Sequence, residues 1–222
     1  MKVLKLNIFQ ETACYKKPFA FKAWETYPLP PYSTVKGMFH KILKEEKEFI
    51  PMRISIQGDY ENKFVNYQSM YFFKGKENTK MPLNIHLLYN VSLIIHVDAE
   101  EEVLNNIVKG LKNSDEYLSL GRREDIVRID GVKFINVNEI DINKLGKIKG
   151  IEKPIYIPIN QLPEEVNGIN YRLNWKYNIV NDLRQWEKID VKYVEEGEMI
   201  YNDNYLEDEE GDIVYFNTTL IS

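Results

Sequence analysis

The sequence predicts an α+β fold in which an antiparallel sheet packs against two helices. The clearest evidence is residues 83–97, where apolar side chains occupy every second position, as expected of a half-buried strand. Residues 33–46 and the segment that follows Asp98 place apolar residues at helical spacing. With further strand candidates around them, the elements follow the order β, α, β, β, α, β. This order is the ferredoxin-like arrangement, which many RNA-recognition (RRM-like) domains share.

The first strand is expected at residues 3–9 (VLKLNIF), and a proline-rich segment leads from there towards the first helix. Three prolines within residues 28–31 favour an extended chain, because proline fixes its own φ and disfavours a helical residue before it. Ser33 is then expected to cap the helix N-terminus. The first turn carries Lys36 and Gly37 instead of acidic residues, which makes a candidate anion site. A proline-guided turn into an ordinary core helix is the simpler interpretation.

A short strand is expected at residues 52–59, and two long strands at residues 63–73 and 83–97. At ~3.3 Å per residue the second long strand would reach roughly 50 Å, well beyond a typical strand. One end of this hairpin is therefore expected to project from the domain as an arm. Its tip is expected at residues 74–82, with Lys74, Lys76 and Lys80 exposed. Lysines in such a place also serve simply to protect strand edges.

Asp98 is expected to cap the second helix, with Glu101 completing a capping box. A strand at residues 132–138 follows, and from about residue 146 the pattern changes to short β-like segments separated by turns. We therefore expect two units. The first is a ferredoxin-like domain at residues 1–145 that contains the hairpin at about 63–97. The second is a small β-rich subdomain at residues 146–222 with an acidic tail.

Composition limits the possible function classes. Hydrophobic residues make up 44% and charged residues 28% of the 222 residues, an ordinary globular balance. No apolar run approaches the ~20 residues of a transmembrane helix, and the N-terminus lacks the apolar core of a signal peptide. Cys14 is the single cysteine, and three scattered histidines show no metal-ligand spacing. We expect a soluble, cytoplasmic protein without a metal or another cofactor.

Charge is distributed unevenly along the chain. The formal net charge is −5, which alone would argue against a nucleic-acid partner. Residues 1–97, however, carry 14 Lys and Arg against 8 Asp and Glu, whereas residues 98–222 carry 15 against 26. Such polarity predicts that one face meets an anion and another repels it or meets a basic partner.

Two basic segments are candidate RNA contacts. In the loop at 15–27, Lys16 and Lys17 lie among aromatic residues, a mixture that suits base stacking and phosphate contact. In the GRRED segment, Gly121 precedes Arg122 and Arg123, and arginine forks suit phosphate oxygens. Each segment also has a structural interpretation. The aromatic residues could belong to the core, and the arginines could pair with Glu124, Asp125 or another acidic neighbour.

Three segments together resemble the Cas-five subunits of type I CRISPR surveillance complexes (Cascade), which belong to the RAMP superfamily. They are LPPYSTVKGMFHKIL at 29–43, HLLYNVSLIIHV at 86–97 and YLSLGRREDIVRI at 117–129. The similarity is nearest to subtype I-B and spans roughly the first 140 residues, whereas the C-terminal third shows no matching motif.

The resemblance implies a ferredoxin-like RAMP domain that binds the 5′ handle of the CRISPR RNA (crRNA). It also implies a β-hairpin thumb that meets the first backbone (Cas-seven) subunit, with the large subunit docked alongside. The implied RNA contacts are Lys16, Lys17, Tyr32, Ser33, Thr34, Lys36, Gly37, Gly121, Arg122 and Arg123. The implied thumb residues are Lys74, Lys76, Lys80 and His86. A non-catalytic RNA-binding subunit that takes part in antiviral defence is the expected function.

Two alternatives remain open. One branch of the family, in subtype I-C, cuts precursor crRNA with a tyrosine, a lysine and an adjacent histidine, but no Lys-His dipeptide occurs here. His40 and His86 with Lys80 could serve as a metal-independent endoribonuclease set if the fold brought them together. The other alternative is a protein-only assembly module that uses the acidic C-terminal half.

Overall fold

The structure is a computed structural model, and it describes residues 1–18, 22–45, 48–75, 77–141, 149–163, 166–200 and 204–218. Lys76 lies outside the described residues, as does the side chain of Lys74.

The described elements are ten strands, two α-helices and one 3₁₀ turn. In chain order they are β1 (Lys2–Ala13), β2 (Ala23–Trp24), α1 (Tyr32–Leu43), β3 (Arg53–Lys74), β4 (Glu77–Asp98), α2 (Glu101–Lys112), β5 (Arg128–Asp141), β6 (Ile155–Pro158), η1 (Ile159–Gln161), β7 (Ile169–Val180), β8 (Leu183–Val194), β9 (Asn204–Asp208) and β10 (Ile213–Val214). Neither α-helix is long and apolar enough to cross a membrane.

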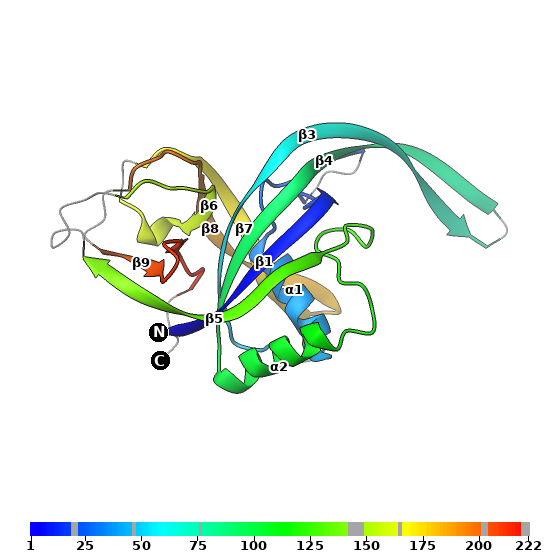
Figure 1. The fold of residues 1–222 in the computed structure, drawn as a ribbon. Coiled ribbons are helices and arrows are strands. Elements are labelled where there is room, and N and C mark those ends of the chain that lie inside the picture. Colours follow the sequence, from blue (N-terminus) through cyan, green and yellow to red (C-terminus); the bar gives the residue numbers. More distant parts are fainter. Residues whose placement is uncertain are drawn as a thin grey trace.

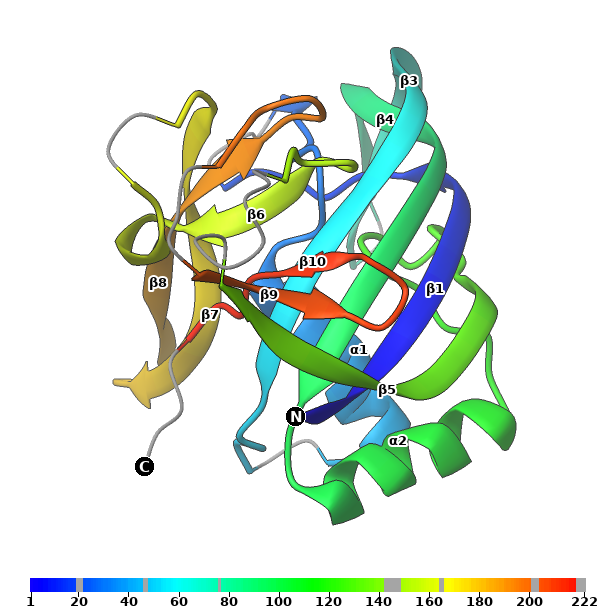
Figure 2. The same cartoon turned by 60° about the vertical axis from the view of Figure 1, so that its left-hand side comes forward.

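The strands form one curled sheet in the order β10-β9-β5-β1-β4-β3-β6-β8-β7, with every neighbouring pair antiparallel. The short strand β2 runs parallel to β4. α1 and α2 lie together against one face of the sheet (Figure 1). The β9–β10 hairpin crosses the opposite face of β1, β4 and β3 (Figure 2). The protein is therefore a mostly antiparallel half-barrel with two helices.

Side chains alternate between the two faces of the sheet along β1 and β4, and this alternation explains the composition of each face. Leu4, Leu6 and the other apolar positions join the core cluster that also contains the buried side of α1. The intervening positions carry Lys5 and His96, which are buried beneath the C-terminal segment. This segment is tied to β3, because the Tyr215 N–H donates to Ser55 Oγ at 3.0 Å. The face of the sheet that carries Lys5 and His96 is thus also an interior face, and hydrogen bonds hold the C-terminal segment against it.

The long hairpin expected from the period-two pattern is present. β3 and β4 keep one register from Arg53 opposite Asp98 to Lys74 opposite Glu77. Its outer end projects beyond the rest of the molecule (Figure 1). We call residues 63–88 the arm.

Two details of the arm prediction were wrong. The segments 52–59 and 63–73 belong to one strand, and the loop expected at 74–82 is mostly paired, with Lys80 opposite Tyr71. Gly75 has a φ of +59°, a left-handed conformation that suits a tight turn. Pro82 is tolerated within β4 because β2 pairs with β4 only at Asn84 and Ile85, which leaves an open edge beside the proline.

Both predicted N-caps were also wrong. α1 begins at Tyr32, and the Pro31 carbonyl, not the Ser33 side chain, accepts the N–H groups of Thr34 and Val35. Asp98 ends β4 and accepts a 2.7 Å hydrogen bond from Arg53 Nε. Its carboxylate therefore clamps the base of the hairpin, and Glu100 precedes α2 without a side-chain cap.

Candidate functional site

A cavity of about 940 Å³ opens between α1, the end of α2 and the β7–β8 hairpin. We call it the basic cleft. Its wall residues are Ser33, Lys36, Gly37, His40, Lys41, Ile42, Lys44, Glu45, Glu48, Phe49, Lys109, Gly110, Asn113, Ser114, Asp115, Glu116, Leu118, Trp175, Lys176, Tyr177 and Arg184. Six lysine or arginine side chains line it against four carboxylates, although the whole chain is acidic. The excess of cations and the aromatic walls suit an anionic, aromatic ligand such as RNA.

Lys36 lies in the wall of the basic cleft with only 5% of its surface exposed. Its Nζ lies 2.9 Å from the centroid of the Phe49 ring and 4.7 Å from that of Trp175. No described residue forms a hydrogen bond with it. Burial, and to a lesser extent the charge of Lys176, lowers the pKa of Lys36 to about 7. Such an unpaired buried amine is typical of a functional position.

His40 follows Lys36 by one helical turn in the same wall. Its Nδ1 lies 3.1 Å from the Glu45 carbonyl oxygen, so Nδ1 carries the proton and donates. Nε2 is left as an acceptor without a hydrogen-bond partner among the described residues. Burial lowers the pKa of His40 despite the hydrogen bond to Glu45, which opposes the shift. The imidazole is therefore neutral near pH 7.

The structure brings four of the residues suggested by sequence into this cleft: Ser33, Lys36, Gly37 and His40. A side chain at Gly37 would meet no atom within 4 Å, so a ligand can approach the helix backbone there. Tyr32 is instead fully buried, with its ring 6.4 Å from that of Trp175. The N–H of Thr34 is bonded to Pro31 and is therefore not available to an anion.

The GRRED loop is held by an internal ion pair. Arg122 Nη2 lies 2.6 Å from Oδ1 of Asp125, whose carboxylate is fully buried and also accepts the Cys14 N–H at 2.9 Å. Gly121 has a φ of +110°, and a side chain there would come within 3.0 Å of the Cys14 carbonyl. Arg122 thus pairs with Asp125, as the structural interpretation expected, and Gly121 helps to shape the loop.

Arg123 is exposed and makes no ion pair with the described residues. The pKa of Glu116 is lowered, chiefly by its hydrogen bond with Lys41 and also by the charge of Arg123. Arg123 therefore lies near the rim of the basic cleft, to which Glu116 belongs.

Lys16 and Lys17 follow β1 in the neighbouring loop. Lys16 Nζ lies 4.2 Å from the ring centroid of Trp24, and Lys17 pairs with Glu25 at 3.3 Å. The proposed nuclease set is not brought together. His40 lies on α1, whereas His86 and Lys80 are six residues apart along β4, roughly 20 Å at the usual strand rise.

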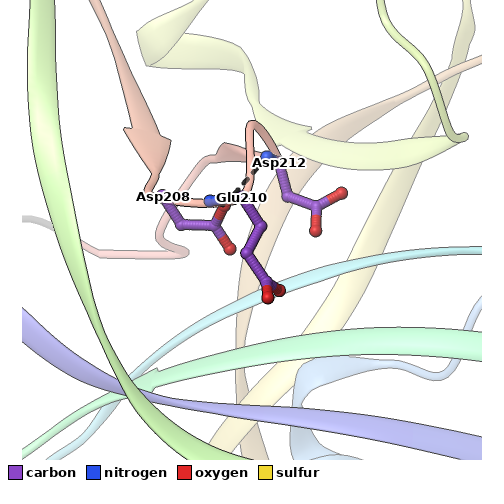
Figure 3. Close-up of side chains that lie close together, drawn as sticks. All are labelled: Asp208, Glu210 and Asp212. Atoms are coloured by element: carbon purple, nitrogen blue, oxygen red, sulfur yellow. Dashed lines mark hydrogen bonds between the residues drawn. The ribbon is translucent and has the colours of Figure 1, made fainter.

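An acidic cluster on the opposite face of the sheet was missed by sequence reasoning. Asp208, Glu210 and Asp212 direct their carboxylates to a common point (Figure 3). The ammonium group of Lys5 lies there, 2.6, 2.8 and 2.5 Å from the three side chains. Lys5 supplies the positive charge that a metal ion would otherwise supply, so the cluster is a clamp between β1 and the β9–β10 turn. The signal that could have indicated this cluster was the presence of two ionisable residues, Lys5 and His96, within otherwise apolar strands.

Known proteins identify the family. The sequence profile described as CRISPR-associated protein (Cas_Cas5) matches residues 3–184. The chain belongs to this family. The assignment confirms the Cas-five resemblance of the sequence motifs.

Solved structures share the fold at low sequence identity. A chain of a "CRISPR RNA-guided surveillance complex" is similar with a TM-score of 0.62 and 12% identity, over 89% of this chain and 90% of that one. A CRISPR protein from Archaeoglobus fulgidus gives a TM-score of 0.50 and 12% identity, over 99% and 100%. No curated protein sequence matches the chain.

Proposed function

We propose that this Cas5-family chain is a non-catalytic subunit of a type I CRISPR surveillance complex that binds the 5′ handle of crRNA in the basic cleft. The observation that carries the proposal is the cation-rich, aromatic-walled cleft beside α1 in a chain of this family. A similar fold in a CRISPR RNA-guided surveillance complex supports the same role. The protein would act in the cytoplasm, in a complex of subtype I-B type.

The β5-β1-β4-β3 part of the sheet, with α1 and α2 on one face, supports a ferredoxin-like RAMP domain. In this proposal the remaining strands extend both edges of that domain.

Within the cleft, Lys44, Lys109 and Arg184 would contact backbone phosphates, and Phe49 and Tyr177 would stack on bases. Arg123 and Lys16 would extend the contact beyond the rim. Arg122 would act indirectly by holding the loop that carries Arg123.

The arm is proposed to dock on the first backbone subunit, with the large subunit alongside. One face of the arm carries exposed apolar side chains from β3, namely Val65, Tyr67, Tyr71 and Phe73. Exposed apolar side chains beside open strand edges are typical of a protein interface.

A direct test incubates the purified protein with labelled repeat RNA and with labelled handle RNA, in EDTA, on parallel native and denaturing gels. The expected result is a shift without cutting that is weakened by Lys109→Glu and by Arg184→Glu. Lys2→Glu is the matched control, since Lys2 is exposed but lies outside the cleft. Equal affinity of all four proteins would reject the cleft as the RNA site.

A second candidate function, metal-independent cleavage of precursor RNA, is favoured by His40, whose Nε2 has no hydrogen-bond partner among the described residues and which lies one helical turn from Lys36. Nε2 would remove the proton of a 2′-hydroxyl, and the Lys36 ammonium would protonate the departing 5′ oxygen. The products would be a 2′,3′-cyclic phosphate and a 5′-hydroxyl. Cutting on the denaturing gel that His40→Ala abolishes would establish this function in place of the first.

A further inference from the structure

Lys36 is an unusual cation because no carboxylate among the described residues pairs with it. Buried ammonium groups in folded proteins are ordinarily paired, since burial without a partner disfavours the charged form. Only 5% of the surface of Lys36 is exposed, and its Nζ has no hydrogen-bond partner among the described residues. The rings of Phe49 and Trp175 give it partial compensation through cation–π contact.

Charged groups from every surrounding element also line the cleft, but none of the described carboxylates forms an ion pair with Lys36. These groups are His40 and Lys41 of α1, Lys44, Glu45 and Glu48 of the following loop, Lys109 of α2, Asp115 and Glu116 after it, Lys176 of β7 and Arg184 of β8. Glu116 is bound to Lys41, and Lys176 is bound to Glu187. The position in front of Lys36 therefore suits an anion supplied by a ligand.

The wall beside Lys36 offers further groups that suit a phosphodiester and its attached nucleoside. Gly37 leaves the helix backbone open, and Ser33 adds a hydroxyl to the same wall. Phe49 is 45% exposed, so part of its ring is available to stack on a base. The ligand would thus meet one cation, one hydroxyl and one aromatic face within a single wall.

We propose that Lys36 is the phosphate-binding lysine of the basic cleft and that it takes up a proton when a phosphodiester of the RNA binds. This inference rests on the proposed function and adds a proton to its binding equilibrium. The proton comes from solvent and converts the neutral amine into an ammonium that donates to the phosphate oxygen.

The direction of the pH effect follows from the two states of Lys36. Free, its pKa is about 7, so a large fraction of the protein holds a neutral amine above that pH. A bound phosphodiester is a permanent anion and raises the pKa of Lys36. Affinity must therefore fall as pH rises from 7 towards the pKa of the bound state, with a limiting slope of about tenfold per pH unit. His40, whose pKa is lowered, is neutral throughout this range and does not contribute.

The experiment measures the affinity of the full chain for a fluorescent single-stranded RNA carrying the repeat-derived handle, by anisotropy, from pH 6.5 to 8.5 at constant salt. Wild type is expected to lose affinity about tenfold per pH unit at the upper end. Lys36→Arg, permanently charged, should bind with no such slope. Lys36→Met should bind weakly and also without slope. Lys41→Met, a cleft lysine that is 54% exposed, should weaken binding while keeping the wild-type slope.

Calorimetric titration of wild type in two buffers of different ionisation enthalpy measures the number of protons taken up on RNA binding. This measurement needs no variant, so it does not depend on whether the Lys36 variants fold. Uptake of about half a proton near pH 7 is expected. RNA binding with no proton uptake, or a Lys36→Met variant with the wild-type slope, would overturn the inference and leave the proposed function standing. Absence of RNA binding by wild type at every pH would overturn both.

Discussion

Replacing Lys5 by methionine tests the clamp between β1 and the β9–β10 turn. The change removes an ammonium that is 2% exposed and leaves its volume nearly filled. The fully buried carboxylate of Asp208 then loses the ammonium group that balances its charge. Removing one partner of such a buried pair costs about 3–5 kcal/mol, and in a chain of this size each kcal/mol shifts Tm by roughly 2–4 °C. We therefore expect Tm to fall by roughly 6–20 °C.

The pH dependence of this loss has a definite sign. Burial alone would raise the pKa of Asp208, but hydrogen bonds from His96 and Lys5 more than offset this and keep it well below its usual range. A lowered carboxylate pKa contributes stability above the unfolded-state value of about 4, and this contribution is lost as pH falls. The deficit of Lys5→Met should thus be complete at pH 7 and should shrink towards pH 4, where the carboxylates of the variant become protonated.

The assay is thermal unfolding followed by circular dichroism at pH 7 and at intervals down to pH 4. Lys133→Met is the matched control, because Lys133 also binds Glu210 but is 44% exposed. Its Tm should stay close to that of wild type. A Tm of Lys5→Met within 2 °C of wild type at pH 7, or a deficit that grows on acidification, would refute the reasoning.

Three further predictions concern the two arginines of the GRRED loop and the arm. Arg122→Ala should lower stability by about 2–4 kcal/mol in urea unfolding, because buried Asp125 loses its partner; an unchanged midpoint would contradict this. Arg123→Glu should leave the urea midpoint unchanged but weaken RNA binding and its salt dependence in anisotropy titrations, and an unchanged salt slope would remove Arg123 from the interface. Replacing residues 69–82 by Asn-Gly joins the paired Gln68 and Leu83, so the fold should survive while co-purification with the other complex subunits is lost. Normal assembly of this variant would reject the arm as the docking element.

Patterns that one element carries by itself could be predicted from sequence. Alternation within residues 83–97 predicted β4, because one face of that strand is apolar and packs against the helices. Helical spacing likewise predicted α1, although three residues too long at its C-terminus, since Lys44 turns left-handed at a φ of +56° and ends the helix.

Features that depend on distant residues could not be predicted. Lys36 was recognised only as a first-turn cation, and its burial arises from Phe49 and from Trp175, which β7 brings against α1. The sequence around Lys5 did not indicate its partners, because they lie at the other end of the chain in the β9–β10 turn. Ser33 matched the local preference for a cap, but burial of Tyr32 extends the helix by one residue and makes Pro31 its first acceptor.

Ultraviolet cross-linking of the chain to handle RNA, followed by mass spectrometry of the linked peptides, tests the central claim most directly. The account predicts cross-links at the aromatic walls of the basic cleft, Phe49, Trp175 and Tyr177. Cross-links confined to the arm or to the face that carries Asp208, with none in the cleft, would contradict it.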